Sequence, residues 1–166
     1  MKTLVLCRHA KSDWPEGVPD IQRPLKNRGI NDATYLAKLL AEQDFEPDLI
    51  LSSPAKRART TADIFAAELG FARPIQEERS IYYEGVASLI QLIKDLPPRA
   101  RSVMIFGHNP TFEDTVRTLL YSQARFEMPT CGMACFEIES FQWDQVNAMN
   151  LHLRWLLVPR LKRKGI

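Results

Sequence analysis

Histidine and arginine recur directly after apolar runs at three separate places in the chain. The segments read CRHAKSD from position 7, SSPAKRAR from position 52 and GHNPTFE from position 107. They hold His9 and His108, two of the three histidines, together with Arg8 and Arg57. Two arginines and a protonated histidine could neutralise a phosphoryl group, which carries roughly two negative charges. The other histidine, kept neutral by the cations around it, could attack phosphorus, so these residue types predict phosphoryl transfer through a phosphohistidine intermediate.

Cysteine is the competing nucleophile, because Cys7 lies beside an arginine. A cysteine-based phosphatase needs an arginine six positions after its thiolate, but aspartate, glutamate and phenylalanine stand there after the three cysteines of this chain. Side chains alternate across a strand, so we expect Cys7 to fill the core on the face opposite Arg8. Cys131 and Cys135 are also expected to be core thiols, because a three-residue spacer without a second such pair is a poor zinc motif.

Other routes to phosphate chemistry lack their motifs. The seven glycines form no Walker-type phosphate loop, no dinucleotide-binding fingerprint and no serine-hydrolase elbow. A metallophosphatase would need an Asp-x-His partner and dense carboxylates near GHNP, so we expect neither a metal nor a cofactor. A phosphate-binding module without turnover is the alternative from a different class, although binding alone requires cations and not two histidines.

Length and composition bound the remaining possibilities. The chain has 166 residues, 45% hydrophobic and 25% charged, which predicts one globular domain over 1–166. Its net charge of +2 argues against a dedicated nucleic-acid binder. The basic segment 160–164 is expected to be a solvated end, with docking to an acidic surface as the alternative. The sequence does not indicate an oligomeric state.

Targeting signals are also missing from the sequence. The apolar run after Lys2 is too short for a signal-peptide core, and no run approaches the length of a membrane span. The odd number of cysteines favours a reducing compartment. We therefore expect a cytoplasmic protein that does not associate with membranes.

Hydrophobic periodicity predicts strands that alternate with helices. Helices are expected over about 29–42, from Ser53-Pro54, through 86–93 and from Asn109-Pro110. Strands are expected over 3–7, 49–52, 103–106, 134–139 and 150–158. This alternation predicts a three-layer α/β/α fold with a mainly parallel central sheet. Ligands bind beyond the carboxyl ends of such strands, where the three segments lie, and two of these segments open helices whose N-termini favour anions.

The segments RHAKS, SSPAKRARTTA and GHNP, in this order, resemble the motifs of the histidine phosphatase superfamily. The short length and the segment DIQRPLKNRG resemble its small SixA-type phosphohistidine phosphatases, which lack cap insertions. The resemblance spans most of the chain and implies a phosphoglycerate mutase-like fold. It further implies His9 as the phosphate-accepting nucleophile, His108 as the second histidine on the phosphoryl oxygens, and Arg8, Arg57 and Arg23 as phosphate ligands.

Ser53 could contribute to the phosphate pocket, but capping its helix is the better-founded role. The sequence departs from the family pattern in two respects, and the first is Ala10, which stands where the first motif usually has glycine. The general acid has no clear counterpart, because the region that aligns with a glutamate in larger relatives reads RSIYYEGVAS. Glu84 is the nearest carboxylate there, and Asp20 is the competing candidate.

The missing acid bears on the substrate. General acid catalysis is worth about 10²–10⁴-fold, and an alkoxide leaving group depends on it. The P–N bond of phosphohistidine has a better leaving group once its imidazole is protonated, which solvent can accomplish. We therefore expect a protein-borne phosphohistidine as the substrate, with small-molecule phosphomonoesters as the alternative.

Overall fold

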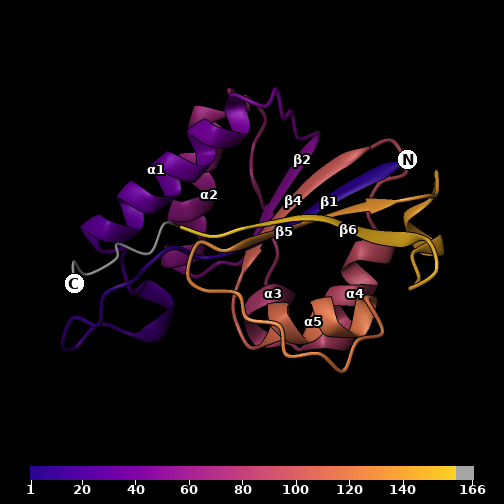
Figure 1. Ribbon diagram of the computed structural model, residues 1–166. Coiled ribbons are helices and arrows are strands. Elements are labelled where there is room, and N and C mark those ends of the chain that lie inside the picture. The colour runs from indigo at the N-terminus through magenta and orange to yellow at the C-terminus, as the bar shows by residue number, and fades with distance from the viewer. Residues whose placement is uncertain (160–166) are drawn as a thin grey trace, which may run out of the picture.

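A six-stranded sheet forms the centre of the computed structural model, which describes residues 1–159 (Figure 1). Its strand order is β3-β2-β4-β1-β5-β6. The first four strands in this order run parallel to one another, β5 is antiparallel to β1, and β6 is antiparallel to β5. The strands are β1 (Lys2–Arg8), β2 (Leu49–Ser52), β3 (Gln76–Glu77), β4 (Ser102–Gly107), β5 (Met133–Ile138) and β6 (Leu151–Leu157).

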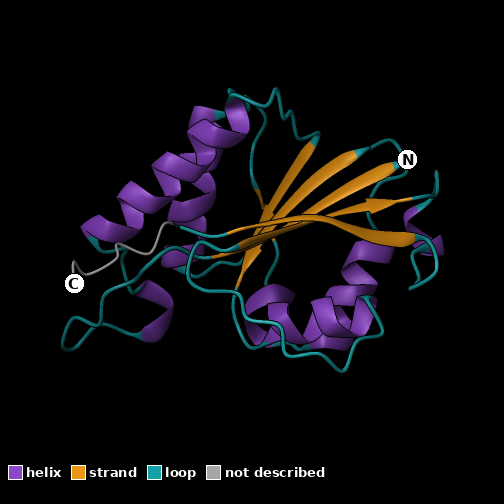
Figure 2. Cartoon of the chain, in the orientation of Figure 1, coloured by secondary structure: helices purple, strands orange, loops and turns teal. Residues whose placement is uncertain are grey.

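Helices cover both faces of this sheet. The two longest, α1 and α2, pack on one face, and α3, α4 and α5 lie on the other (Figures 1 and 2). Their bounds are α1 (Asn27–Ala41), α2 (Lys56–Glu68), α3 (Ser80–Tyr83), α4 (Val86–Lys94) and α5 (Thr111–Leu119), with short 3₁₀ turns at Asp20–Gln22 and Trp143–Gln145. The three-layer α/β/α fold with a mainly parallel sheet is confirmed.

The core explains why the central strands read as nearly continuous apolar runs. In β1, Leu4 and Leu6 belong to the cluster under α4 and α5, whereas Val5 and Cys7 belong to the cluster under α1 and α2. Both faces of β1 are therefore buried, as expected for a strand of a doubly covered sheet. Cys7 is fully buried, as predicted.

Two predicted helix starts were wrong. The second helix begins at Lys56, not at Ser53, because Ala55 is still extended and the Ser53 hydroxyl accepts a hydrogen bond from the Ala55 N–H within the preceding turn. The helix expected from Asn109-Pro110 begins at Thr111. In both places the chain makes a turn between strand and helix, and that turn carries site residues.

Two further expectations concern membrane-spanning helices and the basic segment near the C-terminus. No helix among residues 1–159 is both long and apolar enough to cross a membrane. The basic segment 160–164, whose role was left between a solvated end and a docking element, lies outside the described residues.

Candidate active site

The two histidines meet because their strands are neighbours. β4 lies between β1 and β2, and all three run in parallel. The backbone N–H of His9 donates to the Gly107 carbonyl at 2.9 Å, and the backbone N–H of Ser53 donates to the Phe106 carbonyl at 3.0 Å. The rings of His9 and His108 lie with their centroids 5.3 Å apart. Residues from three distant parts of the sequence therefore meet at one edge of the sheet.

A cavity of about 260 Å³ opens at this edge. It contains both predicted histidines and all three predicted arginines. Its lining consists of Arg8, His9, Lys11, Ser12, Trp14, Arg23, Arg57, His108, Asn109 and Thr130. Four of these residues are arginine or lysine and none is acidic, so the cavity favours an anion.

His9 is held as a neutral imidazole with a defined tautomer. Its Nδ1 lies 2.8 Å from the carbonyl oxygen of Ala10, which can only accept, so Nδ1 carries the hydrogen. Nε2 then keeps its lone pair. Burial, with Arg57, Arg8 and Arg23 nearby, lowers the His9 pKa to about 4, against the hydrogen bond to Ala10 that raises it. His9 is thus a neutral imidazole at neutral pH, and its Nε2 lone pair has the character that a nucleophile requires.

His108 is also neutral in this site. Burial, together with His9 and Arg57, lowers its pKa to about 3. Without a bound anion, the cations that surround the ring therefore disfavour the protonated second histidine expected from the sequence. Its Nε2 lies 2.7 Å from the Ser53 hydroxyl, so Ser53 fixes the ring in addition to organising the turn.

The arginines present hydrogen-bond donors that have no acceptor. Arg57 is 6% exposed and donates from its two terminal nitrogens to the backbone carbonyl and carboxylate of Asp20, at 2.7 and 3.1 Å. Arg8 donates to the Met128 carbonyl at 3.0 Å. Within residues 1–159, the buried Nε atoms of Arg8 and Arg57 and Nδ1 of His108 have no hydrogen-bond partner. Buried polar atoms without partners are uncommon. Both guanidinium groups line the cavity, where an oxyanion would accept charge-assisted hydrogen bonds from them.

Arg23 is fixed on three sides. Its nitrogens donate to the Asp13 carbonyl at 2.9 Å, to the Asp20 carboxylate at 3.0 Å and to the Ser12 hydroxyl at 2.7 Å. Only 6% of the residue is exposed. Arg23 is therefore part of the cavity wall and not an arginine on the open surface, because these acceptors hold its guanidinium group there.

Asp20 connects three elements around the cavity. Its carboxylate pairs with Arg23 and Arg57 and accepts a hydrogen bond from the Tyr82 hydroxyl at 2.6 Å. The hydrogen bond from Tyr82 is the main reason that the Asp20 pKa is lowered to about 2. Arg23 and Arg57 also lower this pKa, whereas burial raises it. Glu84, by contrast, is exposed, accepts a hydrogen bond from the Ser88 hydroxyl and does not line the cavity. Of the two candidate acids, only Asp20 contacts the predicted site residues.

Tyr82 was missed because the segment RSIYYEGVAS was searched only for carboxylates. Its ring packs edge-on against His108, with centroids 5.5 Å apart. Tyr82 belongs to α3, a single helical turn just after β3 at the same edge of the sheet, and neither of these short elements is apparent from the sequence. Aromatic residues at a strand end deserve the same scrutiny as acids.

Buried contacts hold the segment after His9 in place. Ala10 is fully buried, and its N–H donates to the Thr61 hydroxyl at 3.0 Å, so the alanine fits where the family usually has glycine. Gly29 at the start of α1 lies against the backbone of Lys11, where an added Cβ would come within 2.2 Å of the carbonyl oxygen. Only glycine allows the helix to approach this close.

Metal-binding chemistry has no ligand set in the described part of the chain. Residues 1–159 contain no group of three or more histidine, cysteine, aspartate or glutamate side chains placed to hold an ion. All three cysteines are buried free thiols, as predicted for Cys131 and Cys135. Burial raises the pKa of Cys7 well above its usual value, so this thiol is poorly suited to act as a nucleophile.

Comparisons with known proteins agree with this geometry. The family model of the histidine phosphatase superfamily (branch 1) matches residues 4–81. An uncharacterized protein of Mycobacterium tuberculosis is 33% identical over 92% of this chain and 99% of its own length. An uncharacterized chloroplastic protein of Arabidopsis thaliana is 30% identical over 94% of this chain and 75% of its own.

Solved structures share the fold over nearly the whole chain. A structure named phosphohistidine phosphatase SixA, from Agrobacterium tumefaciens, is 29% identical, has a TM-score of 0.81 and covers 95% of this chain and 98% of that one. The protein histidine phosphatase SixA in complex with tungstate has the same TM-score at 19% identity, over 95% and 97% of the two chains, and so supports the fold alone. Together with the paired histidines, these matches show that the chain belongs to the histidine phosphatase superfamily and is similar to its small SixA members.

Proposed function

We propose that this protein is a metal-independent phosphatase that forms a phosphohistidine on His9 and acts on protein-borne phosphohistidine in the cytoplasm. The observation that carries the proposal is the His9 tautomer. Nδ1 donates to the Ala10 carbonyl, so the Nε2 lone pair is free in a cavity surrounded by cations. A neutral imidazole nitrogen with this preorganisation is an effective nucleophile toward phosphorus.

The reaction has two steps. In the first, Nε2 of His9 attacks phosphorus, a P–Nε2 bond forms, and the bond to the leaving group breaks with its electron pair. When the leaving group is an imidazole, its other ring nitrogen takes a proton from solvent, so the ring departs as neutral imidazole. In the second, water attacks phosphorus, the P–Nε2 bond breaks, and inorganic phosphate leaves while one proton of the water passes to solvent.

Arg8, Arg57, Arg23 and His108 bind and polarise the phosphoryl oxygens in this scheme. Arg8, Arg23 and Arg57 all line the cavity, and guanidinium groups form strong, charge-assisted hydrogen bonds to phosphoryl oxygens. A bound dianion would also raise the His108 pKa, since an opposite charge nearby favours the protonated ring. Phosphate binding is therefore expected to take up a proton on His108, which restores the cationic histidine that transfer requires.

The state of Asp20 supports the choice of substrate. A carboxylate whose pKa is lowered to about 2 is ionised at neutral pH and cannot donate a proton. Glu84 lies outside the cavity lining. We infer that the Asp20 side chain and backbone carbonyl accept hydrogen bonds that orient Arg23 and Arg57, as an amide at this position also could, and that neither candidate acid protonates the leaving group. This favours a substrate whose leaving group can take its proton from solvent, as the imidazole of phosphohistidine can, over an alkyl phosphomonoester.

Two alternatives remain to be tested against this proposal. Small-molecule phosphomonoesters would use the same cavity, and a phosphate-binding module would use the same arginines. The two neutral histidines favour an enzyme over a binding module, since only the cations are needed to bind.

Parallel hydrolysis assays separate the three possibilities. The substrates are a phosphohistidine protein, a sugar phosphate and an aryl phosphate, each assayed with wild type, His9→Ala and wild type with EDTA. The proposal predicts the highest kcat/KM for the phosphohistidine protein, loss of turnover in His9→Ala with phosphate binding partly kept, and no effect of EDTA. Efficient sugar-phosphate turnover would contradict the substrate assignment, and full turnover by His9→Ala would contradict the mechanism.

A further inference from the structure

Trp14 has an unusual position for a tryptophan. It lines the cavity with both histidines, yet 73% of its surface is exposed. An indole left in water gives up the stabilisation that burial of its large apolar surface would provide. Exposed aromatic side chains occur elsewhere on this chain, but Trp14 is the aromatic side chain at the rim of the predicted phosphate pocket.

The Trp14 ring is held in place. The guanidinium carbon of Arg23 lies 3.2 Å from the ring centroid, so the cation stacks on one face of the indole. Arg23 is itself fixed by three hydrogen bonds and is nearly buried, and it therefore acts as a rigid support. The backbone N–H of Trp14 donates to the Asp13 carboxylate at 2.9 Å, which helps to fix the main chain that carries the ring.

The loop that carries Trp14 is closed at its base. The Asp13 N–H donates to the Pro24 carbonyl at 2.8 Å, next to a bridge between Ser12 and Leu25. Support from Arg23 and a closed loop reduce the entropy that the indole would lose when it contacts a ligand. The free part of the ring is thus a prepared contact surface.

The position of this surface indicates what it contacts. The arginines and histidines surround the phosphoryl group, so the group attached to phosphorus must extend toward the rim, where Trp14 lies. Planar rings stack well on a free indole face, whereas alkyl groups gain less. We propose that Trp14 selects phosphoryl substrates whose leaving group is a planar ring, such as the imidazole of phosphohistidine. This proposal rests on the proposed function, whose site it deepens.

A purely structural role for Trp14 predicts a different pattern. If the indole only covers Arg23, its removal would loosen one phosphate ligand and weaken all phosphoryl ligands by the same factor. If it stacks on the leaving group, its removal would weaken only ligands that have a ring. The comparison of two phosphonates that differ in the ring alone separates these roles.

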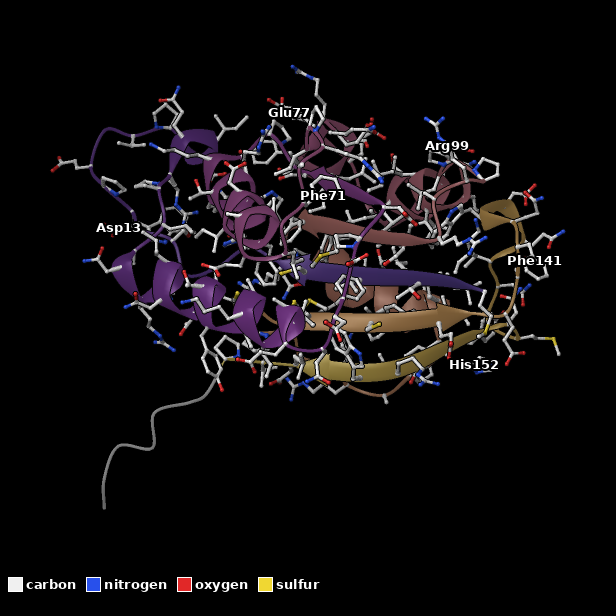
Figure 3. The ribbon with its side chains drawn as sticks, turned by 90° about the horizontal axis from the view of Figure 1, so that it is seen from above. Asp13, Phe71, Glu77, Arg99, Phe141 and His152 are labelled. Atoms are coloured by element: carbon white, nitrogen blue, oxygen red, sulfur yellow. The ribbon has the colours of Figure 1, made fainter. Side chains whose placement is uncertain are left out.

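The test measures the dissociation constants of phenylphosphonate and methylphosphonate by calorimetry. In wild type we expect phenylphosphonate to bind roughly 5- to 10-fold more tightly, and we expect Trp14→Ala to reduce this preference to about 1. Trp14→Phe should retain most of it. Phe141→Ala is the matched control, since Phe141 is 83% exposed and lies at the opposite end of the molecule from Asp13, the neighbour of Trp14 (Figure 3).

Equal affinity for the two phosphonates in wild type, or an equal loss for both in Trp14→Ala, would overturn the proposal. These ligands are not hydrolysed, so the result does not depend on turnover. Failure of the proposed function would appear separately, as absence of phosphohistidine hydrolysis by wild type. Where wild type is active, Trp14→Ala should lower kcat/KM for phosphohistidine and aryl phosphate by the same 5- to 10-fold, and leave phosphoramidate within about 2-fold.

Discussion

His9 and His108 should make the protein less stable in mild acid. In the folded chain the pKa of His9 is about 4 and that of His108 about 3, against 6.5 for an ordinary histidine. As pH falls through 6.5, the two histidines bind protons in the unfolded chain but stay neutral in the folded chain, so the free energy of unfolding decreases. The loss continues until the pH reaches the folded-state pKa values.

The size of this effect follows from the pKa shifts. Between pH 7 and pH 5, each such histidine removes about 2 kcal/mol, so the pair removes about 4 kcal/mol of the free energy of unfolding. This is a large share of the 5–15 kcal/mol that is typical of whole proteins, roughly stated. Asp20 adds nothing in this range, because its lowered pKa contributes stability that is lost only below about pH 4.

Urea unfolding at pH 7, 6 and 5 measures the effect. His9→Gln and His108→Gln should each retain about half of the pH dependence, and His152→Gln should keep all of it. His152 is exposed on β6 and lies at a distance from Asp13 in Figure 3, so its replacement leaves the buried pair intact. If wild type loses no stability between pH 7 and pH 5, neither histidine is held neutral by the fold, and the reasoning is refuted.

Two further predictions concern hydrogen bonds that hold the residues around the cavity. Asp20→Asn should bind inorganic phosphate roughly 2- to 5-fold more tightly in calorimetry, because the partly exposed carboxylate no longer competes for Arg57. Weaker binding would contradict this expectation and show that Arg57 needs the negative charge of Asp20 to stay in place. Thr61→Val should lower the free energy of unfolding by about 1–3 kcal/mol, because Thr61 is fully buried and its loss leaves the Ala10 N–H without an acceptor. Thr118→Val, which removes a similar but exposed hydroxyl, should change it by less than about 0.5 kcal/mol.

The sequence alone predicts most of the fold, because each central strand is a short apolar run between helical periods. β2 matches its predicted bounds, and the layer architecture follows from the alternation. The helix starts are less predictable. The serine and proline after β2 are typical of a helix N-terminus, but the chain extends through Ala55 first.

The site residues are predictable where the residue type is rare, and less so where its role depends on partners. His9 and His108 are two of three histidines in the chain and follow adjacent parallel strands. The neutral state of His108 depends on burial beside other cations, which no local pattern encodes. Likewise, the link between Asp20 and Tyr82 joins a loop to a helix 62 positions away, so only the tertiary structure reveals it.

The central claim is that His9 carries the phosphoryl group between the two steps. Rapid mixing with a ³²P-labelled phosphohistidine protein, an alkaline quench and peptide mass spectrometry would detect this intermediate directly. The account predicts a phosphoryl group on His9 that is stable in alkali, labile in acid and absent from His9→Ala. Turnover without label on His9, or label on another residue, would contradict it.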